Sequence, residues 1–235
     1  MESEKERLKK SVYYPIGMVM LLWLVKGSEW IFAQDFGAMG ILPRTLKGTK
    51  GILLSGFVHG DVLHLMSNTI PLVLLGGTII YFYYRKSFQI ILVLYLLTSS
   101  LVWLFARPAY HIGASGLVYG MLSFLLFSGL IRRDRQTLAI SLAVLILYGG
   151  SIFSGLVPGD FRISWESHLM GFVVGILSAV FYRKFPLPFT KVDNQLDEII
   201  PKEKALDELY SSTSANDRQA VTFRYHYKEK DDKDQ

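Results

Sequence analysis

The sequence contains no cysteine among its 235 residues. This absence excludes disulfide bridges, thiolate metal sites and a cysteine nucleophile. The apolar segments also lack an HExxH motif and any pair of histidine or carboxylate side chains four residues apart on one helix face. We therefore expect no metal and no cofactor. The main chemical alternative is a metal site assembled from scattered residues, namely His59, His64, His111 and His168 with Asp61 or Glu166.

Charged residues are scarce over most of the chain, and hydrophobic residues make up 51% of it. Six apolar segments approach or exceed the ~18 residues needed to cross a bilayer core of ~30 Å. They cover residues 12–33, 62–84, 87–106, 114–131, 136–157 and 163–182. The first segment is the least uniform, because Lys26 and Glu29 interrupt it. We predict an all-α membrane protein, a bundle of six transmembrane helices with a long semi-apolar outer loop over residues 34–61.

The charge distribution predicts the orientation of these helices. Residues 186–235 hold 8 basic and 11 acidic residues, so the preceding part holds 17 basic and 9 acidic residues, a net charge of +8. Four basic clusters precede the first span and follow the second, fourth and sixth spans, which places all four on one side of the membrane. The positive-inside rule makes that side cytoplasmic. Because this pattern is explained by topology, we do not expect a nucleic-acid partner.

Three regions are expected along the chain. Residues 1–11 form a cytoplasmic N-terminal segment, residues 12–184 form the six-helix domain, and residues 185–235 form a polar, partly disordered cytoplasmic tail. The basic start leads into an apolar run without a small-residue cleavage pattern, so no cleaved signal peptide is expected. We predict a multi-pass protein of a bacterial inner membrane with both termini in the cytoplasm. The oligomeric state is left open.

Polar residues inside spans are costly and are candidates for function. In the second span His64 and Asn68 are four residues apart and share a helix face, and the same holds for Ser115 and Tyr119 in the fourth. His59 lies about 140° around a helix from His64 and is expected at the junction between loop and helix, with the two side chains pointing apart.

The sixth span carries a third polar position, His168, on one stripe with Gly171 and Gly175. Two small residues four apart allow a neighbouring helix to approach closely. In the predicted topology His64, Ser115 and His168 all lie at a similar depth below the outer surface. A serine and a histidine at one depth on close-packed helices are typical of a buried nucleophile and its base.

Each motif also has an ordinary structural interpretation. Glycine and serine at a helix start commonly serve packing and capping, and an intramembrane histidine commonly makes a helix–helix hydrogen bond. We expect His111, four residues before Ser115, to face solvent and to be a weaker candidate base. Two other functions stay open: a non-catalytic protein that binds transmembrane clients, and a small transporter or channel. The transporter is disfavoured by the lack of an acidic residue well inside a span.

Together these motifs resemble those of the rhomboid intramembrane serine proteases. The resemblance covers residues 12–184 in order, spacing and host helix. The family patterns H-x4-H-x3-N, G-x-S-G with a following aromatic, and H-x-x-G-x-x-x-G correspond to His59, His64 and Asn68, then Gly113, Ser115, Gly116 and Tyr119, then His168, Gly171 and Gly175.

The resemblance implies a role for each matched residue. Ser115 would be the nucleophile and His168 its general base, without an acidic third member, because Glu166 lies on another face of the helix. His64 and Asn68 would donate to the oxyanion together with the Ser115 backbone N–H. In addition, Tyr119 would orient the imidazole of His168, His59 would anchor the first loop, and Gly113 would allow a tight entry into the serine helix. The partners implied are transmembrane protein substrates and membrane lipids.

The sequence departs from the family in its first outer loop. Many members carry a Trp-Arg pair nine and eight residues before the first motif histidine, where this chain has Lys50 and Gly51. The change affects expected loop anchoring and lipid contacts but not the serine and histidine. The family's substrate gate, the fifth span and the following loop, corresponds to residues 145–165, in which Gly155 and other glycines would make the segment deformable.

Overall fold

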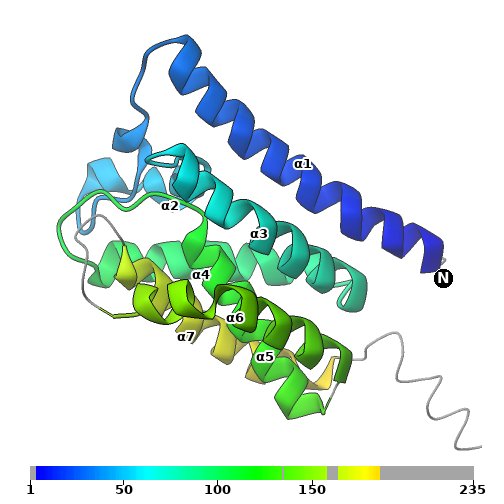
Figure 1. Cartoon of the computed structure of the whole chain (residues 1–235). Coiled ribbons are helices and arrows are strands. Elements are labelled where there is room, and N and C mark those ends of the chain that lie inside the picture. The colour runs from blue at the N-terminus through cyan, green and yellow to red at the C-terminus, as the bar shows by residue number, and fades with distance from the viewer. Residues whose placement is uncertain (1–3, 134, 158–163, 186–235) are drawn as a thin grey trace, which may run out of the picture. The chain divides into compact units, whose positions relative to one another are not determined.

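The structure is a computed structural model that describes residues 4–133, 135–157 and 164–185. No strand occurs among these residues, and one isolated backbone bridge joins Ile41 to His111. The long helices are α1 (Glu4–Ile31), α3 (Val62–Phe82), α4 (Ser87–Phe105), α5 (Ser115–Arg132), α6 (Arg135–Gly155) and α7 (Trp165–Phe181) (Figure 1). The short ones are η1 (Gly37–Met39), η2 (Leu46–Gly48), α2 (Gly51–Leu54), η3 (Ser55–Phe57) and η4 (Tyr182–Lys184). The predicted all-α bundle is confirmed, and the predicted tail lies outside the described residues from residue 186 onward.

Five of the described helices are long and apolar enough to cross a membrane: α1, α3, α4, α5 and α7. The chain is therefore a multi-pass membrane protein. Helix α6 has 21 residues and lies where the sequence predicts the fifth span, but it is not among these five, so the count of six stays a prediction. Helix α1 begins at Glu4 rather than at residue 12, because the charged segment before the span consists of good helix formers.

Helix α5 lies inside the bundle, packed against α3, α4, α6 and α7 (Figure 1). Within the most apolar 18-residue stretch of α5, 72% is buried, compared with 22% for the same stretch of α1 and 28% for that of α4. The exposed large side chains of α1 and α4 therefore form much of the apolar outer surface that a membrane protein presents to lipid. Any function carried by α5 is shielded from the surrounding lipid.

Close packing of α5 on α7 follows from glycines on both helices. A Cβ added at Gly171 would overlap the carbonyl oxygen of Gly116 and would lie 3.0 Å from the carbonyl carbon of that residue. A Cβ added at Gly175 would lie 2.9 Å from the Phe124 backbone nitrogen. Real Cβ atoms do not approach backbone this closely, so only glycine permits the observed helix separation. The sequence predicts this small-residue contact, and the structure contains it.

The loop over residues 34–61, which the sequence predicts as the first outer loop, packs against the bundle. The Arg44 guanidinium donates to the carbonyls of Leu104 at 3.1 Å and Ala106 at 2.8 Å, at the end of α4. The indole of Trp103 donates to the Thr45 carbonyl at 3.0 Å. The loop is thus held by side-chain bonds to backbone, although it lacks the Trp-Arg pair that many family members carry.

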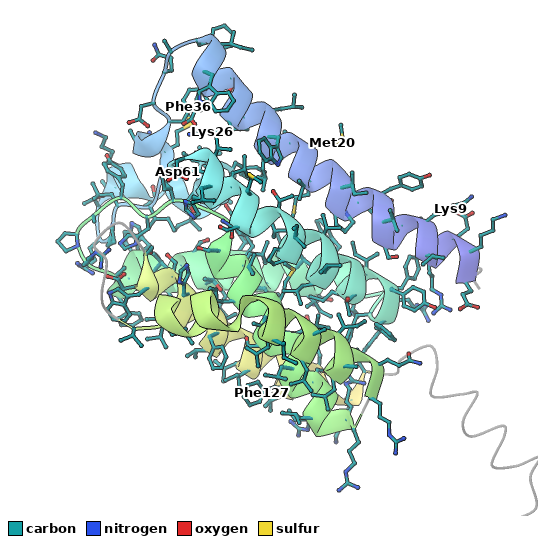
Figure 2. The ribbon with its side chains drawn as sticks, in the orientation of Figure 1. Lys9, Met20, Lys26, Phe36, Asp61 and Phe127 are labelled. Carbon is teal, nitrogen blue, oxygen red and sulfur yellow. The ribbon has the colours of Figure 1, made fainter. Side chains whose placement is uncertain are left out.

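The two ends of the bundle differ in chemistry. We call the end at which α3, α5 and α7 begin the site end, and the opposite one the basic end. Figure 2 shows Lys9 toward one end of α1 and Lys26 toward the other, on the side of Phe36 and Asp61. At the basic end the Lys10 ammonium donates to the Tyr84 hydroxyl at 3.0 Å.

Candidate active site

Ser115 and His168 meet at the site end of the bundle. The His168 Nε2 lies 2.8 Å from the Ser115 Oγ, and both residues are buried, 8% and 9% exposed respectively. Ser115 is the first residue of α5, and His168 lies in the first turn of α7. The structure therefore brings together the two residues that the sequence predicts as nucleophile and base.

The second ring nitrogen of His168 fixes the tautomer. His168 Nδ1 lies 2.8 Å from the carbonyl oxygen of Gly155, at the end of α6. A carbonyl only accepts, so the proton resides on Nδ1 and the Nε2 lone pair is left to accept from the Ser115 hydroxyl. Gly155 has to be small, because a Cβ there would lie 2.8 Å from His168 Nδ1. This acceptor is a site residue that sequence reasoning placed only in a deformable segment.

Tyr119 lies against the imidazole of His168. Their ring centroids are 4.2 Å apart and the planes differ by 6°, which is a stacked pair. Tyr119 lies one turn after Ser115 on α5. The same helix therefore supplies the serine hydroxyl and the aromatic ring that stacks on the histidine. The stack limits rotation of the ring about the axis that would carry Nε2 away from Ser115.

The loop before α5 is shaped by its own backbone bonds. Gly113 has φ of +103°, a conformation that favours glycine, and its N–H donates to the Ser55 carbonyl at 2.9 Å. A Cβ there would also lie 2.6 Å from the His64 ring. The Ala114 N–H donates to His59 Nε2 at 3.3 Å. The Gly113 and Ala114 donors are thus engaged, whereas the Ser115 N–H, at the first helical position, has no acceptor within the helix.

His64 and Asn68 lie on α3 beside this loop. Asp61 caps the helix by accepting from the His64 backbone N–H at 2.7 Å, and Asn68 Nδ2 donates to the His64 carbonyl at 2.9 Å. Asn68 is buried, and the His64 imidazole lies against Gly113. His64 is therefore on the α3 face toward the serine loop, and Asn68 follows it by one helical turn.

The prediction that the side chains of His59 and His64 point apart is wrong. Their rings form an edge-to-face pair with centroids 5.1 Å apart. The reason is that α3 begins only at Val62, so His59 precedes the helix and helical angles do not apply to it. Burial and the neighbouring His64 lower the pKa of His59 to about 4, against the opposing effect of the Phe57 carbonyl. His59 is therefore neutral at pH 7 and can accept from Ala114.

The prediction that His111 faces solvent is also wrong. His111 is 3% exposed, because backbone pairing with Ile41 draws its loop against the first outer loop. Its Nε2 lies 3.0 Å from the Arg107 carbonyl and its Nδ1 lies 2.5 Å from the Ser164 hydroxyl. Burial lowers its pKa, while the bond to the Arg107 carbonyl raises it. Both nitrogens are occupied, so His111 does not compete with His168 for Ser115.

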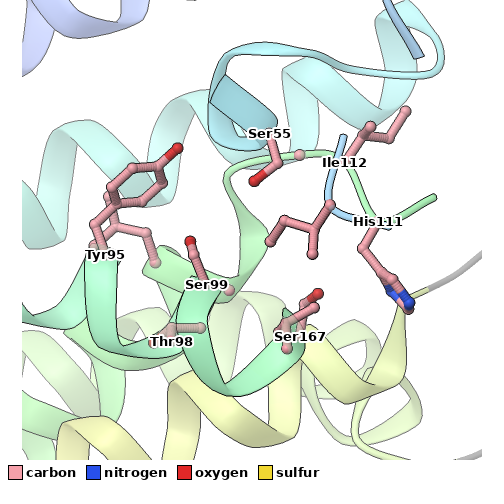
Figure 3. Close-up of a pocket in the computed structure, with 12 residues that line it drawn as sticks. Ser55, Tyr95, Thr98, Ser99, His111, Ile112 and Ser167 are labelled. Atoms are coloured by element: carbon pink, nitrogen blue, oxygen red, sulfur yellow. The ribbon is translucent and has the colours of Figure 1, made fainter. Parts of the chain in front are cut away.

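A small cavity with both polar and apolar lining adjoins the start of α5. It is lined by hydroxyl-bearing and aliphatic side chains, by His111 and by Gly113 and Gly116; Figure 3 labels its polar residues and Ile112. The hydroxyl-bearing residues are Ser55, Tyr95, Thr98, Ser99 and Ser167. Its volume of about 20 Å³ suits a single water molecule. The buried Thr98 hydroxyl has no partner among the described residues and offers such a water a contact.

Among the described residues no carboxylate bonds to the His168 ring, whose nitrogens contact the Gly155 carbonyl and the Ser115 hydroxyl. Glu166 is buried, and its Oε1 lies 3.6 Å from the Arg107 guanidinium and 3.4 Å from the Arg107 backbone nitrogen. In the described part of the chain no three histidine, aspartate or glutamate side chains gather as metal ligands would. Residues 158–163 of the expected gate lie outside the described residues.

Comparison with known proteins agrees with this geometry. The sequence profile of the Rhomboid domain family matches residues 49–185. An uncharacterised protein of Mycobacterium tuberculosis (strain H37Rv) is 34% identical over 169 residues, which cover 68% of this chain and 70% of that protein. An uncharacterised protein of Mycobacterium leprae is 35% identical over 168 residues, covering 68% and 66%. RHOMBOID-like protein 4 of Arabidopsis thaliana is 28% identical over 163 residues, covering 64% and 39%.

The family profile includes all three motif regions and every long helix except α1. The match covers more than half of the chain and contains the buried serine and histidine. The chain belongs to the rhomboid family.

Proposed function

We propose that this protein is an intramembrane serine endopeptidase that uses Ser115 and His168 as a catalytic dyad. The observation that carries the proposal is the 2.8 Å contact between His168 Nε2 and Ser115 Oγ, with Nδ1 tied to the Gly155 carbonyl. This arrangement is the one a general base requires.

In the proposed reaction Ser115 Oγ bonds to the scissile carbonyl carbon while its proton passes to His168 Nε2. The C–N bond then breaks and the leaving amine takes that proton, which leaves an ester on Ser115. A water attacks the ester carbon and gives a proton to Nε2. The C–Oγ bond then breaks, Oγ takes that proton from Nε2, and the new carboxylic acid end of the substrate leaves. The cavity beside Gly116 is a suitable source of this water.

The oxyanion would be stabilised by the Ser115 N–H with the side chains of His64 and Asn68. Each preorganised donor in a site shielded from water contributes about 3 kcal/mol to the transition state. The engagement of the Gly113 and Ala114 N–H groups supports this choice of donors. Asn68→Ala should lower the rate by about 100-fold without abolishing it, since two donors remain. An unchanged rate would remove Asn68 from this role.

The substrates we propose are transmembrane segments of membrane-anchored proteins. The Ser–His pair lies at the site end, opposite the basic clusters, so the positive-inside rule assigns cleavage to the outer face of a bacterial inner membrane, with both termini in the cytoplasm. A substrate helix must unwind locally before its carbonyls are accessible, because they bond within the helix. Membrane lipids are the other expected partners.

A serine-directed fluorophosphonate and a transmembrane reporter substrate test the proposal. We expect wild-type protein to label at Ser115 and cleave the reporter, and Ser115→Ala and His168→Ala each to abolish cleavage while the helices stay folded. Ser123→Ala is the matched control, because it removes another buried hydroxyl of α5 and should retain activity. Full activity of Ser115→Ala would refute the proposal. A wild-type protein that binds transmembrane clients but neither labels nor cleaves would be a non-catalytic member of the family.

A further inference from the structure

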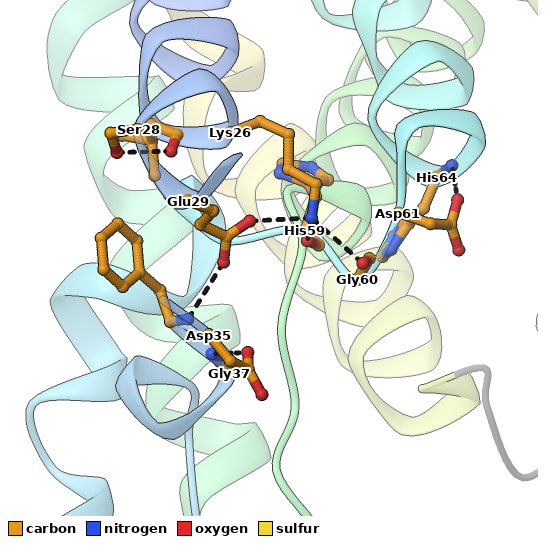
Figure 4. A network of polar contacts seen from close by, with 11 residues as sticks. Lys26, Ser28, Glu29, Asp35, Gly37, His59, Gly60, Asp61 and His64 are labelled. Atoms are coloured by element: carbon orange, nitrogen blue, oxygen red, sulfur yellow. Dashed lines mark hydrogen bonds and ion pairs between the residues drawn. The ribbon is translucent and has the colours of Figure 1, made fainter. Parts of the chain in front are cut away.

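Two charged residues interrupt the apolar sequence of α1, and the structure buries both. Lys26 is 8% exposed and Glu29 is 7% exposed. The Lys26 ammonium donates to Glu29 Oε2 at 2.7 Å, to the His59 carbonyl at 2.8 Å and to the Gly60 carbonyl at 3.1 Å (Figure 4). All three of its hydrogens are therefore used. Such complete bonding is what a buried charge requires.

Glu29 extends this network into the first outer loop. Its Oε1 accepts from the backbone N–H of Phe36 at 3.0 Å (Figure 4). One ion pair therefore joins three segments that are distant in sequence: the end of α1, the start of the outer loop, and the turn at residues 59–61 that leads into α3.

The same turn reaches the serine. Lys26 holds the backbone of His59, and the imidazole of His59 accepts the N–H of Ala114, the residue before Ser115. Two residues farther on, Asp61 caps α3 through the N–H of His64, whose ring lies edge-to-face with that of His59. The position of the turn thus sets both the peptide before Ser115 and the start of the helix that carries the proposed oxyanion donors.

We infer that Lys26 and Glu29 are positioning residues for the proposed hydrolysis, which fix the His59 turn so that the Ser115 N–H and His64 converge on one oxyanion. The inference rests on the proposed function. It concerns residues outside the matched family domain, which begins at residue 49. The pair acts through His59 and does not itself touch the reacting atoms.

A purely structural ion pair makes a different prediction. Removing one partner of a buried pair destabilises a protein strongly because a charge is left uncompensated, whereas replacing both by apolar residues is often neutral or stabilising. In a structural role, Lys26→Met/Glu29→Met should recover both stability and activity. In a positioning role the double variant should recover the fold but not the rate of cleavage. The reason is that the carbonyls of His59 and Gly60 and the N–H of Phe36 lose their hydrogen bonds to Lys26 and Glu29.

The experiment measures kcat and KM for reporter cleavage in wild type and in this double variant, with the concentration of active sites in each protein titrated by fluorophosphonate on a separate sample. Misplacement of reacting groups by about 1 Å costs about 100-fold in rate. We expect kcat to fall by about that factor, with KM within about two-fold of wild type since the substrate-binding surface is unchanged. Lys47→Met is the control: it removes a positive charge from an exposed position in the same outer loop and should leave kcat unchanged.

A double variant that cleaves the reporter at the wild-type kcat per titrated active site would overturn the inference. Glu29→Asp gives a second reading if the double variant does not fold, because it keeps the charge and shortens the side chain by one methylene. Its kcat should fall by about ten-fold, and an unchanged kcat would likewise overturn the inference. Failure of the proposed function is recognised separately, since wild-type protein would then neither label nor cleave.

Discussion

Gly171→Ala would test whether the close approach of α5 and α7 positions the proposed dyad. The added methyl would lie 3.0 Å from the Gly116 carbonyl carbon and 3.2 Å from the Gly120 nitrogen, and closer still to the Gly116 oxygen. These neighbours are backbone atoms and cannot rotate away. The helices must therefore separate, and His168, three residues before Gly171 on α7, must move with its helix.

Two magnitudes follow from this displacement. Overpacking a tight contact costs about 1–3 kcal/mol of the free energy of unfolding. A separation of about 1 Å would stretch the 2.8 Å contact between His168 Nε2 and Ser115 Oγ beyond hydrogen-bonding range, and a misplacement of that size lowers the rate by about 100-fold. The rate should therefore fall far more than the loss of folded protein explains.

Thermal unfolding in nanodiscs and kcat/KM on a transmembrane reporter measure the two effects. Gly17→Ala is the matched control, since it is a helical glycine of α1 with nothing within 4 Å of its Cβ position. It should raise stability by up to about 1 kcal/mol and leave the rate unchanged. If Gly171→Ala cleaves at the wild-type rate, the helix contact does not set the dyad geometry.

Three further predictions concern single residues. Tyr119→Leu should lower kcat by about 5- to 10-fold, because an aromatic stack contributes about 1 kcal/mol, whereas Tyr119→Phe should stay near wild type in the same assay. Folding lowers the pKa of His59 from 6.5 to about 4, so between these two pH values the unfolded chain binds more protons than the folded one. The free energy of unfolding should therefore fall by up to about 3 kcal/mol as the pH drops from 6.5 to about 4. Equilibrium unfolding of His59→Asn should show a smaller fall over the same range. Arg133→Gly should raise the melting temperature, by about 1 kcal/mol in stability, because Arg133 ends α5 at a φ of 58°, and an unchanged or lower value would count against backbone strain there.

Much of this fold was predictable from the sequence. Transmembrane helices require long apolar runs, so length and composition place five of them without reference to tertiary contacts. The close contact of α5 and α7 follows from glycines spaced one turn apart. The pairing of Ser115 with His168 was predicted from their shared depth together with the motifs of the resemblance.

Contacts made by loops were the ones that sequence reasoning missed. His59 was placed by helical angles although α3 begins after it, and His111 was placed in solvent although its loop pairs with the first outer loop. The contact of His168 with the Gly155 carbonyl could not be predicted, because every residue has a backbone carbonyl and the residue type does not indicate which one bonds to a side chain. Lys26 and Glu29 are visible in the sequence as two charges three residues apart in an apolar run. Their backbone partners in the loop and turn depend on tertiary structure.

The burial of α5 also separates the proposed chemistry from changes in bilayer thickness. Hydrophobic mismatch acts through lipid-facing helices, which respond by tilting or bending. Here α1 and α4 present that surface, while 72% of the most apolar 18-residue stretch of α5 lies inside the protein. A thinner or thicker membrane should therefore tilt the outer helices and change how substrate enters. The Ser115–His168 distance should stay the same, because α5 and α7 are joined to each other more closely than either is to lipid.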